Sequence, residues 1–285
     1  MSLVENKEKW SIIIKPKNKI FEINLKEFFE YADLLFLFVR RDFVAYYKQT
    51  ILGPLWFLLQ PILSTIVFTV IFGNIAKIPT DGVPQVLFYM AGIVCWNYFS
   101  TCLTTNSSTF LSNASIFGKV YFPRLIIPVS VVISNLFKFA IQFALFIFIG
   151  IYFYLKGSNI TPNLWILFFP VLILQMGLIS LGFGLLISAM TTKYRDLSFL
   201  VAFGIQLWMY ATPIVYPISQ IPEKWKFIFM INPMSSIVEV FRYSFLGSGG
   251  VDFQYIFVSL LVTVIIFIIG LLAFNKVEKT FMDMV

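Results

Sequence analysis

The sequence predicts an all-α polytopic membrane protein with six transmembrane helices. Of its 285 residues, 59% are hydrophobic and 12% are charged, and the mean hydropathy is +0.87. A helix rises about 1.5 Å per residue, so about 20 apolar residues cross a hydrocarbon core of about 30 Å. A soluble domain of this length could not bury so much apolar surface. Six apolar blocks have the required length: 54–76, 85–106, 125–155, 163–190, 197–217 and 255–274.

The first 50 residues differ from the blocks that follow. Residues 1–25 predict a cytoplasmic tail, and residues 26–50 predict an amphipathic helix at the membrane interface, ahead of a six-span membrane domain over 51–285. In the helix, Phe28 and Leu35 belong to a set of apolar residues at helical spacing, but the apolar centre is too short to span. A helix that packs on the other cytoplasmic loops is the alternative.

The positions of the positive charges predict the orientation. With six spans, both termini lie on one side, together with the loops at 107–124 and 191–196. Fifteen of the 21 Lys and Arg residues fall on that side, five fall on the other, and Lys138 lies inside the third span. Positive residues favour the cytoplasm, so both termini are predicted to be cytoplasmic. The basic excess therefore indicates topology and contact with anionic membrane lipids, and not nucleic-acid binding.

The external segment 218–254 is apolar but interrupted by proline and glycine. Pro222 predicts a helix start and Pro233 its end, Ser236 and Glu239 fit a capping box for a second helix, and Gly247 predicts its stop. Two helices too short to cross predict a re-entrant helical hairpin before the last span, which forms an external gate. The residues assigned to this gate are Trp225, Ser236 and Glu239, with a hinge at 247–250.

Several chemistries are missing from the sequence. It has no His, and its one Gly-Lys pair, Gly118-Lys119, lacks the other residues of a phosphate-binding loop. No pair of carboxylates lies within a span, and Cys95 and Cys102 are predicted to be apolar packing residues. We therefore expect a transport subunit, not an enzyme, with no metal and no cofactor in this chain.

Four stretches, taken in order, resemble the permeases of polysaccharide-exporting ABC transporters. They are Arg41-Asp42 with Tyr47 to Trp56 and Gln60-Pro61; Asn113 to Ile116 with Lys119 to Pro128; Tyr194 to Leu197; and Asn232 to Met234. The resemblance covers about residue 28 to the C-terminus and implies a homodimer in the bacterial inner membrane. It also implies two copies of a separate cytosolic ATPase, which binds the ATP and Mg, and a lipid-linked O-antigen, capsule or teichoic acid polymer as substrate.

The resemblance also implies roles for individual residues. The residues expected to couple to the ATPase are Ser115, Phe117, Lys119, Tyr121, Arg124, Tyr194 and Arg195. The alternative is that these loops carry ordinary topology charges. The residues expected to line a channel between the protomers are Trp56, Phe57, Tyr98, Lys138, Trp208, Tyr210 and Tyr216. For the aromatic residues the alternative is lipid contact or bundle packing. Lys138 would meet a phosphate or sugar hydroxyl, or would reach backbone carbonyls instead.

The most favoured cargo is O-antigen, and other functions remain as alternatives. A permease for teichoic acid, capsule or drug export would have a similar sequence. A secondary transporter would carry intramembrane carboxylates or inverted repeats, and neither is apparent. A membrane-embedded glycan transferase would need acidic residues together at one membrane face, whereas Asp42, Asp196 and Glu239 are scattered along the sequence.

Overall fold

The structure, a computed structural model, describes residues 25–48 and 53–280, and every regular element in those ranges is helical. The predicted tail lies almost entirely outside the described residues. The elements are α1 (Leu25–Glu30), α2 (Ala32–Lys48), η1 (Gly53–Leu55), α3 (Trp56–Phe68), η2 (Thr69–Ile75), α4 (Gln85–Asn106), α5 (Thr109–Ser112), α6 (Ala114–Phe117), α7 (Ile126–Leu155), η3 (Leu164–Phe168), α8 (Phe169–Thr191), α9 (Leu197–Tyr210), η4 (Ile218–Gln220), α10 (Glu223–Ile231), α11 (Pro233–Leu246) and α12 (Phe253–Thr280). The all-α prediction is confirmed.

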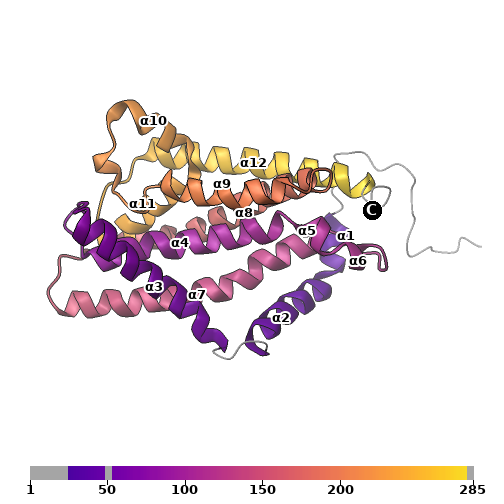
Figure 1. Cartoon of the computed structure of the whole chain (residues 1–285), viewed down its shortest axis with the longest axis horizontal. Coiled ribbons are helices and arrows are strands. Elements are labelled where there is room, and N and C mark those ends of the chain that lie inside the picture. Colours follow the sequence, from indigo (N-terminus) through magenta and orange to yellow (C-terminus); the bar gives the residue numbers. More distant parts are fainter. Residues whose placement is uncertain (1–24, 49–52, 281–285) are drawn as a thin grey trace, which may run out of the picture.

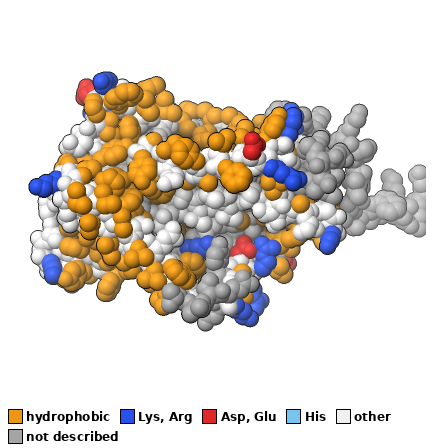
Figure 2. All heavy atoms as spheres, viewed as in Figure 1, with side chains coloured by type: hydrophobic (Ala, Val, Ile, Leu, Met, Phe, Trp, Pro, Cys, Tyr) orange, Lys and Arg blue, Asp and Glu red, His pale blue; other side chains and the backbone are white. Residues whose placement is uncertain are grey.

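The long helices run side by side along the length of the molecule, and α4 lies among them (Figure 1). Of the 22 residues of α4, 15 are buried, and the helix packs against α3, α7, α8 and α11. A predominantly apolar helix that is buried in this way lies in the interior of a bundle. Hydrophobic side chains cover much of the flank of the bundle, while most visible Lys and Arg side chains lie toward its ends (Figure 2).

Helices α8 and α12 approach each other closely. A Cβ atom on Gly270 would collide with the backbone of Gly182, so only two glycines permit this approach. Beside the crossing, Gln175 donates hydrogen bonds to Ser259 Oγ at 2.6 Å and to Thr263 Oγ1 at 3.3 Å. Small residues at the contact and interhelical hydrogen bonds are the usual means of joining helices in a membrane.

Five of the six predicted spans are helices long and apolar enough to cross a membrane. They are Trp56–Ile75, Gln85–Asn106, Ile126–Leu155, Leu164–Thr191 and Phe253–Glu278. The fifth block of the sequence forms only α9, whose 14 residues rise about 21 Å, less than a hydrocarbon core of about 30 Å. Helix α9 ends before Pro213 and Pro217, which cannot continue it. Six full-length spans are therefore not confirmed.

Two side chains from later in the sequence satisfy the backbone after α9. The guanidinium of Arg242 donates hydrogen bonds to the carbonyls of Pro213, at 2.5 Å, and Ile214, at 2.7 Å. The side-chain amide of Asn232 donates to the carbonyl of Ala211 at 3.3 Å. Non-helical backbone beside membrane helices is stable only when protein groups satisfy it. These contacts explain how the chain can leave the helical path here.

Segment 218–254 contains the two short helices that the sequence predicts. Gly247 ends α11 in the left-handed conformation, with φ of 73°, as expected for a C-terminal glycine. The predicted capping box is wrong, because α11 begins at Pro233 and the side chain of Asn232 accepts from Met234 N at 3.1 Å. Asn232 precedes a proline that suits the first helical turn, and this pair decides the start.

The predicted interface helix is present but divided at Tyr31 into α1 and α2. Leu35 and Phe38 are buried and belong to a cluster that includes residues of the 112–124 loop. Phe36 and Leu37 lie on the opposite side and are 65% and 59% exposed. Helix α2 thus packs on a loop, as the alternative proposed, and also presents an apolar face outward, as an interfacial helix does.

Candidate functional site

An aromatic cluster packs against the loop at 112–124. Phe117 is buried, and its ring lies 6.0 Å from that of Phe110 and 5.8 Å from that of Phe122. Phe110 in turn stacks on Phe274 of α12 with ring centroids 4.4 Å apart. Because this cluster joins α5, α6 and α12, the loop has a fixed position at the end of the bundle. Within the loop, Ala114–Phe117 forms the single helical turn α6.

Arg124 joins the same loop to the end of α12. Its Nη1 donates to the carbonyl of Glu278 at 2.5 Å, and its guanidinium lies 5.4 Å from the centre of the Phe117 ring. The neighbouring Tyr121 is 71% exposed. Arg124 and Phe117 therefore position the loop, whereas Tyr121 lies on its surface.

The predicted coupling residues fall into two groups: Phe117 and Arg124, which position the loop, and residues with exposed side chains. Thr191 at the end of α8 donates to Ser107 O at 2.9 Å, so the turn at 192–196 and the 112–124 loop lie at the same end of the bundle. Both segments contribute exposed side chains at this end: Ser115, Lys119, Tyr121, Tyr194 and Arg195. This set, which we call the end surface, is basic and aromatic, and it lies at the end that also holds α1 and the C-terminal part of α12 (Figure 1).

Four of the seven predicted channel residues line one cleft of about 580 Å³ between α3, α4 and α7. They are Trp56, Phe57, Tyr98 and Lys138. Lys138 Nζ lies 5.6 Å from the centre of the Phe57 ring. Besides Gly53, Leu63 and Phe139, the rest of the lining consists of amide and hydroxyl side chains: Gln60, Ser64, Asn97, Thr101, Asn135 and Gln142. We call this the polar cleft.

The polar cleft lies near the middle of α4 and α7 and at the start of α3. Asn97 is near the middle of α4 and donates to Gln142 of α7 at 3.4 Å. Asn135 is buried, and its Nδ2 donates to Val131 O at 2.8 Å. Polar side chains at this depth are costly unless they face protein or a water-filled cavity, so they mark functional positions in membrane proteins. The arrangement offers aromatic faces, hydrogen-bonding groups and one amine to a polar molecule.

The other three predicted channel residues lie elsewhere. Trp208 packs among aromatic rings of α4 and α8, and its Nε1 donates to Asn232 Oδ1 at 3.1 Å. Tyr216 donates from its hydroxyl to the carbonyl of Tyr210 at 2.8 Å. Trp208 thus has packing partners within this chain, and Tyr216 closes the turn after α9. Tyr210 is 48% exposed.

The predicted gate residues lie in two different settings. Trp225 on α10 is half exposed, whereas Ser236 on α11 is buried. Glu239 lies beside the 247–250 turn, and burial raises the pKa of its carboxyl to about 7, against the opposing effect of Arg242. Only α10 presents its gate residue on the surface.

Comparison with known proteins identifies the family. The family profile described as ABC-2 type transporter matches residues 33–246, which is most of the chain. This chain belongs to the ABC-2 type transporter family. Its relatives include O-antigen export system permease protein RfbA of Klebsiella pneumoniae, 29% identical over 88% of this chain and 94% of that protein. The protein of the same name from Myxococcus xanthus is 28% identical over 76% and 82%. Polysialic acid transport protein KpsM of Escherichia coli is 22% identical over 75% and 83%.

One residue of this ABC-2 family member, Arg242, has a structural role that the sequence analysis did not assign. Arg242 is fully buried, donates to three backbone carbonyls and lies 3.6 Å from the centre of the Phe88 ring. In the charge distribution of the sequence, Arg242 is one of the five cations on the external side. The signal was available, because a lone arginine between Phe241 and Tyr243 in an apolar helix must find internal partners. Its partners, however, are 28 to 154 residues away in the sequence.

Proposed function

We propose that this chain is the membrane subunit of an exporter of a lipid-linked surface polysaccharide, with O-antigen as the cargo. The observation that carries the proposal is the match, over 88% of the chain, to a protein named as an O-antigen export permease. The more distant match to a polysialic acid transport protein supports polysaccharide as the cargo class. Export of capsule, teichoic acid or a drug is the alternative within the same family.

The polar cleft supports a path for a glycan. Sugars present hydroxyls along their edges and C–H groups on their faces, so amides and aromatic rings suit them together. Trp56 and Tyr98 supply rings, while Asn97 and Gln142 supply amides in the middle of the bundle. We propose that Lys138 contacts a phosphate or hydroxyl of the passing substrate. A path for an apolar cargo would have no need of these polar groups.

We further propose that two copies of the chain assemble with two copies of a separate cytosolic ATPase, which binds the ATP and Mg. The ATPase docks on the end surface, which places this end and both termini in the bacterial cytoplasm. Lys119, Tyr121 and Arg195 supply charge and aromatic area, and the buried Phe117 fixes the position of the loop that carries Lys119 and Tyr121. This orientation agrees with the excess of positive charge at that end.

We also propose a re-entrant gate at the opposite end, in which α10 moves and α11 stays fixed. Helix α11 buries nearly all of its residues against α4, α8 and α12. Helix α10 has no buried residue among its nine. An element with few buried contacts opens at a lower free-energy cost than one in the core.

The proposal is tested in bacteria that lack their own O-antigen permease. Lys119→Glu should abolish co-purification of the ATPase and surface display of the polymer, because it reverses a charge on the end surface. Lys224→Glu reverses a charge on α10 at the other end and should leave co-purification intact. Equal ATPase recovery with both variants contradicts the docking surface. Failure of the wild-type chain, with its ATPase bound, to restore any O-antigen contradicts the cargo.

A further inference from the structure

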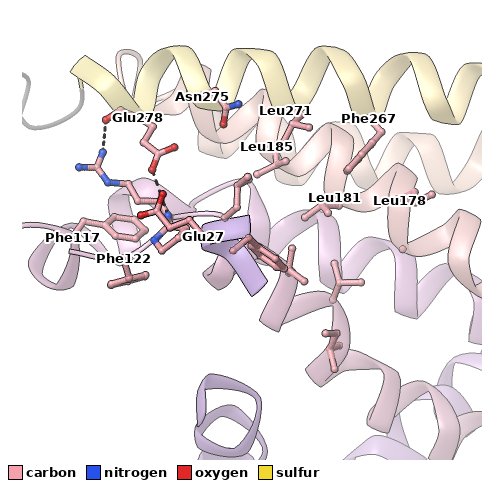
Figure 3. A pocket seen from close by; sticks show the side chains of 18 of the residues that line it. Glu27, Phe117, Phe122, Leu178, Leu181, Leu185, Phe267, Leu271, Asn275 and Glu278 are labelled. Carbon is pink, nitrogen blue, oxygen red and sulfur yellow. Dashed lines mark hydrogen bonds between the residues drawn. The ribbon is translucent and has the colours of Figure 1, made fainter. Parts of the chain in front are cut away.

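A second, larger groove of about 1240 Å³ lies between α7, α8 and α12, on another side of α7 from the polar cleft (Figure 3). Its walls are mostly apolar. The side chains that line its length include Val132, Leu136, Leu178, Leu181, Phe267 and Leu271. In Figure 3, Leu178 and Phe267 lie toward one end, and Glu27 and Glu278 lie at the other.

The dimensions of this groove fit the hydrocarbon part of one lipid. Along α8 its lining runs from Pro170 to Leu185, a rise of about 22 Å. One leaflet of a bilayer contributes about half of a 30 Å hydrocarbon core, so an acyl chain from the nearer leaflet fits within this length. If a methylene takes roughly the 30 Å³ of a water molecule, the volume holds about 40 such groups, which is enough for two acyl chains.

Charges of both signs stand where the groove reaches the end of the bundle. Glu27 of α1 and Glu278 of α12 line this rim, together with Lys119 and Arg124. The backbone N–H of Arg124 donates to Glu278 Oε1 at 3.4 Å, which holds this carboxylate at the rim. A long apolar groove with a charged mouth at one end matches a molecule with a charged head and apolar chains.

The charges at the rim of the groove favour one kind of lipid headgroup. A headgroup with only a phosphate would find two cations but would also face two carboxylates. A headgroup with a phosphate and a protonated amine can place the phosphate toward Lys119 and Arg124 and the amine toward Glu27 and Glu278. Opposite charges across a contact favour the matching partner and exclude the wrong one.

We propose that this groove is a binding site for one aminophospholipid, with its amine and phosphate at the rim and its acyl chains along α7, α8 and α12. The site meets the polar cleft at Tyr98, which lines both, but its other lining residues differ from those of the cleft. Bound there, the lipid would fill the space between α7 and α8 and would join the 112–124 loop to the end of α12.

The test measures which lipid stays on the protein. The full chain is purified in detergent with equal amounts of phosphatidylethanolamine, phosphatidylglycerol and a polyprenyl phosphate, and bound lipid is counted by native mass spectrometry. We expect one phosphatidylethanolamine per chain, retained at least fivefold over either competitor. Leu178→Trp and Leu271→Trp place bulk in the groove and should each lower this retention at least fivefold. The matched control Leu261→Trp adds the same bulk on α12 outside the groove and should change nothing.

The headgroup is tested by Glu27→Gln combined with Glu278→Gln, which should bring the ratio of the two phospholipids close to one. A result in which phosphatidylglycerol or the polyprenyl phosphate is retained best overturns the proposal. So does an equal loss with Leu261→Trp, because that outcome describes general annular binding. If one tryptophan variant fails to fold, the other and the glutamine pair still decide between these outcomes.

Discussion

Arg242 offers the sharpest test of how this fold is held together. Its guanidinium donates to the carbonyls of Phe88, Pro213 and Ile214, and those of the last two lie in the non-helical turn after α9. In Arg242→Met an unbranched apolar side chain remains, but the guanidinium and all three of its hydrogen bonds are lost. A hydrogen bond to a charged group contributes about 1.5–3 kcal/mol, and a buried carbonyl left unpaired costs about 1–3 kcal/mol.

The net effect is smaller than the sum of these values. Removing the guanidinium also removes the cost of burying its charge, which offsets part of the loss. Counting mainly the two turn carbonyls, we expect the free energy of unfolding to fall by about 4 kcal/mol. At about 2–4 °C per kcal/mol, the melting temperature of the purified chain should fall by about 10 °C.

The assay is thermal unfolding of the purified chain in detergent, with all variants heated at one scan rate. Arg242→Lys keeps the charge but not the three-way geometry, so it should fall between wild type and Arg242→Met. The matched control is Lys226→Met on α10, where the side chain is partly exposed, and we expect a change within about 0.5 kcal/mol. A melting temperature for Arg242→Met within 2 °C of wild type would refute the assigned role.

Three further predictions follow from other contacts. Gly270→Ala should lower the melting temperature by several degrees, because its Cβ would meet the backbone of Gly182, whereas Gly150→Ala, with open space around it, should not. Burial raises the pKa of Glu239 to about 7, so the folded state binds a proton that the unfolded state releases above about pH 4.5. Stability should therefore fall as pH rises from about 4.5 to 7, and thermal unfolding of Glu239→Gln should show less of this dependence. Lys138→Met should reduce polymer export at least tenfold at normal expression, measured by surface display, and wild-type export would contradict its place in the path.

Much of the fold follows from the sequence, because hydrophobic length is a local property. The positions of five spans, the two short helices before the last span and the stop at Gly247 were predicted correctly from runs of apolar residues, prolines and a glycine. Each of these features depends on neighbours within a few turns. The family, too, could be inferred from short stretches around Gly53 and Lys119, and the match over residues 33–246 confirms it.

The tertiary structure decided what depends on residues far apart in the sequence. The non-helical turn after α9 is stable because Arg242 and Asn232 satisfy its backbone carbonyls. Trp208 packs among aromatic rings and does not line the polar cleft. Phe117, which was expected to contact the ATPase, is buried beneath its own loop. The side chains of Asn97 and Lys138 share one cleft only because α4 and α7 lie side by side. Hydropathy describes how strongly a segment avoids water, but only packing determines which of its faces meets lipid, another helix or a cavity.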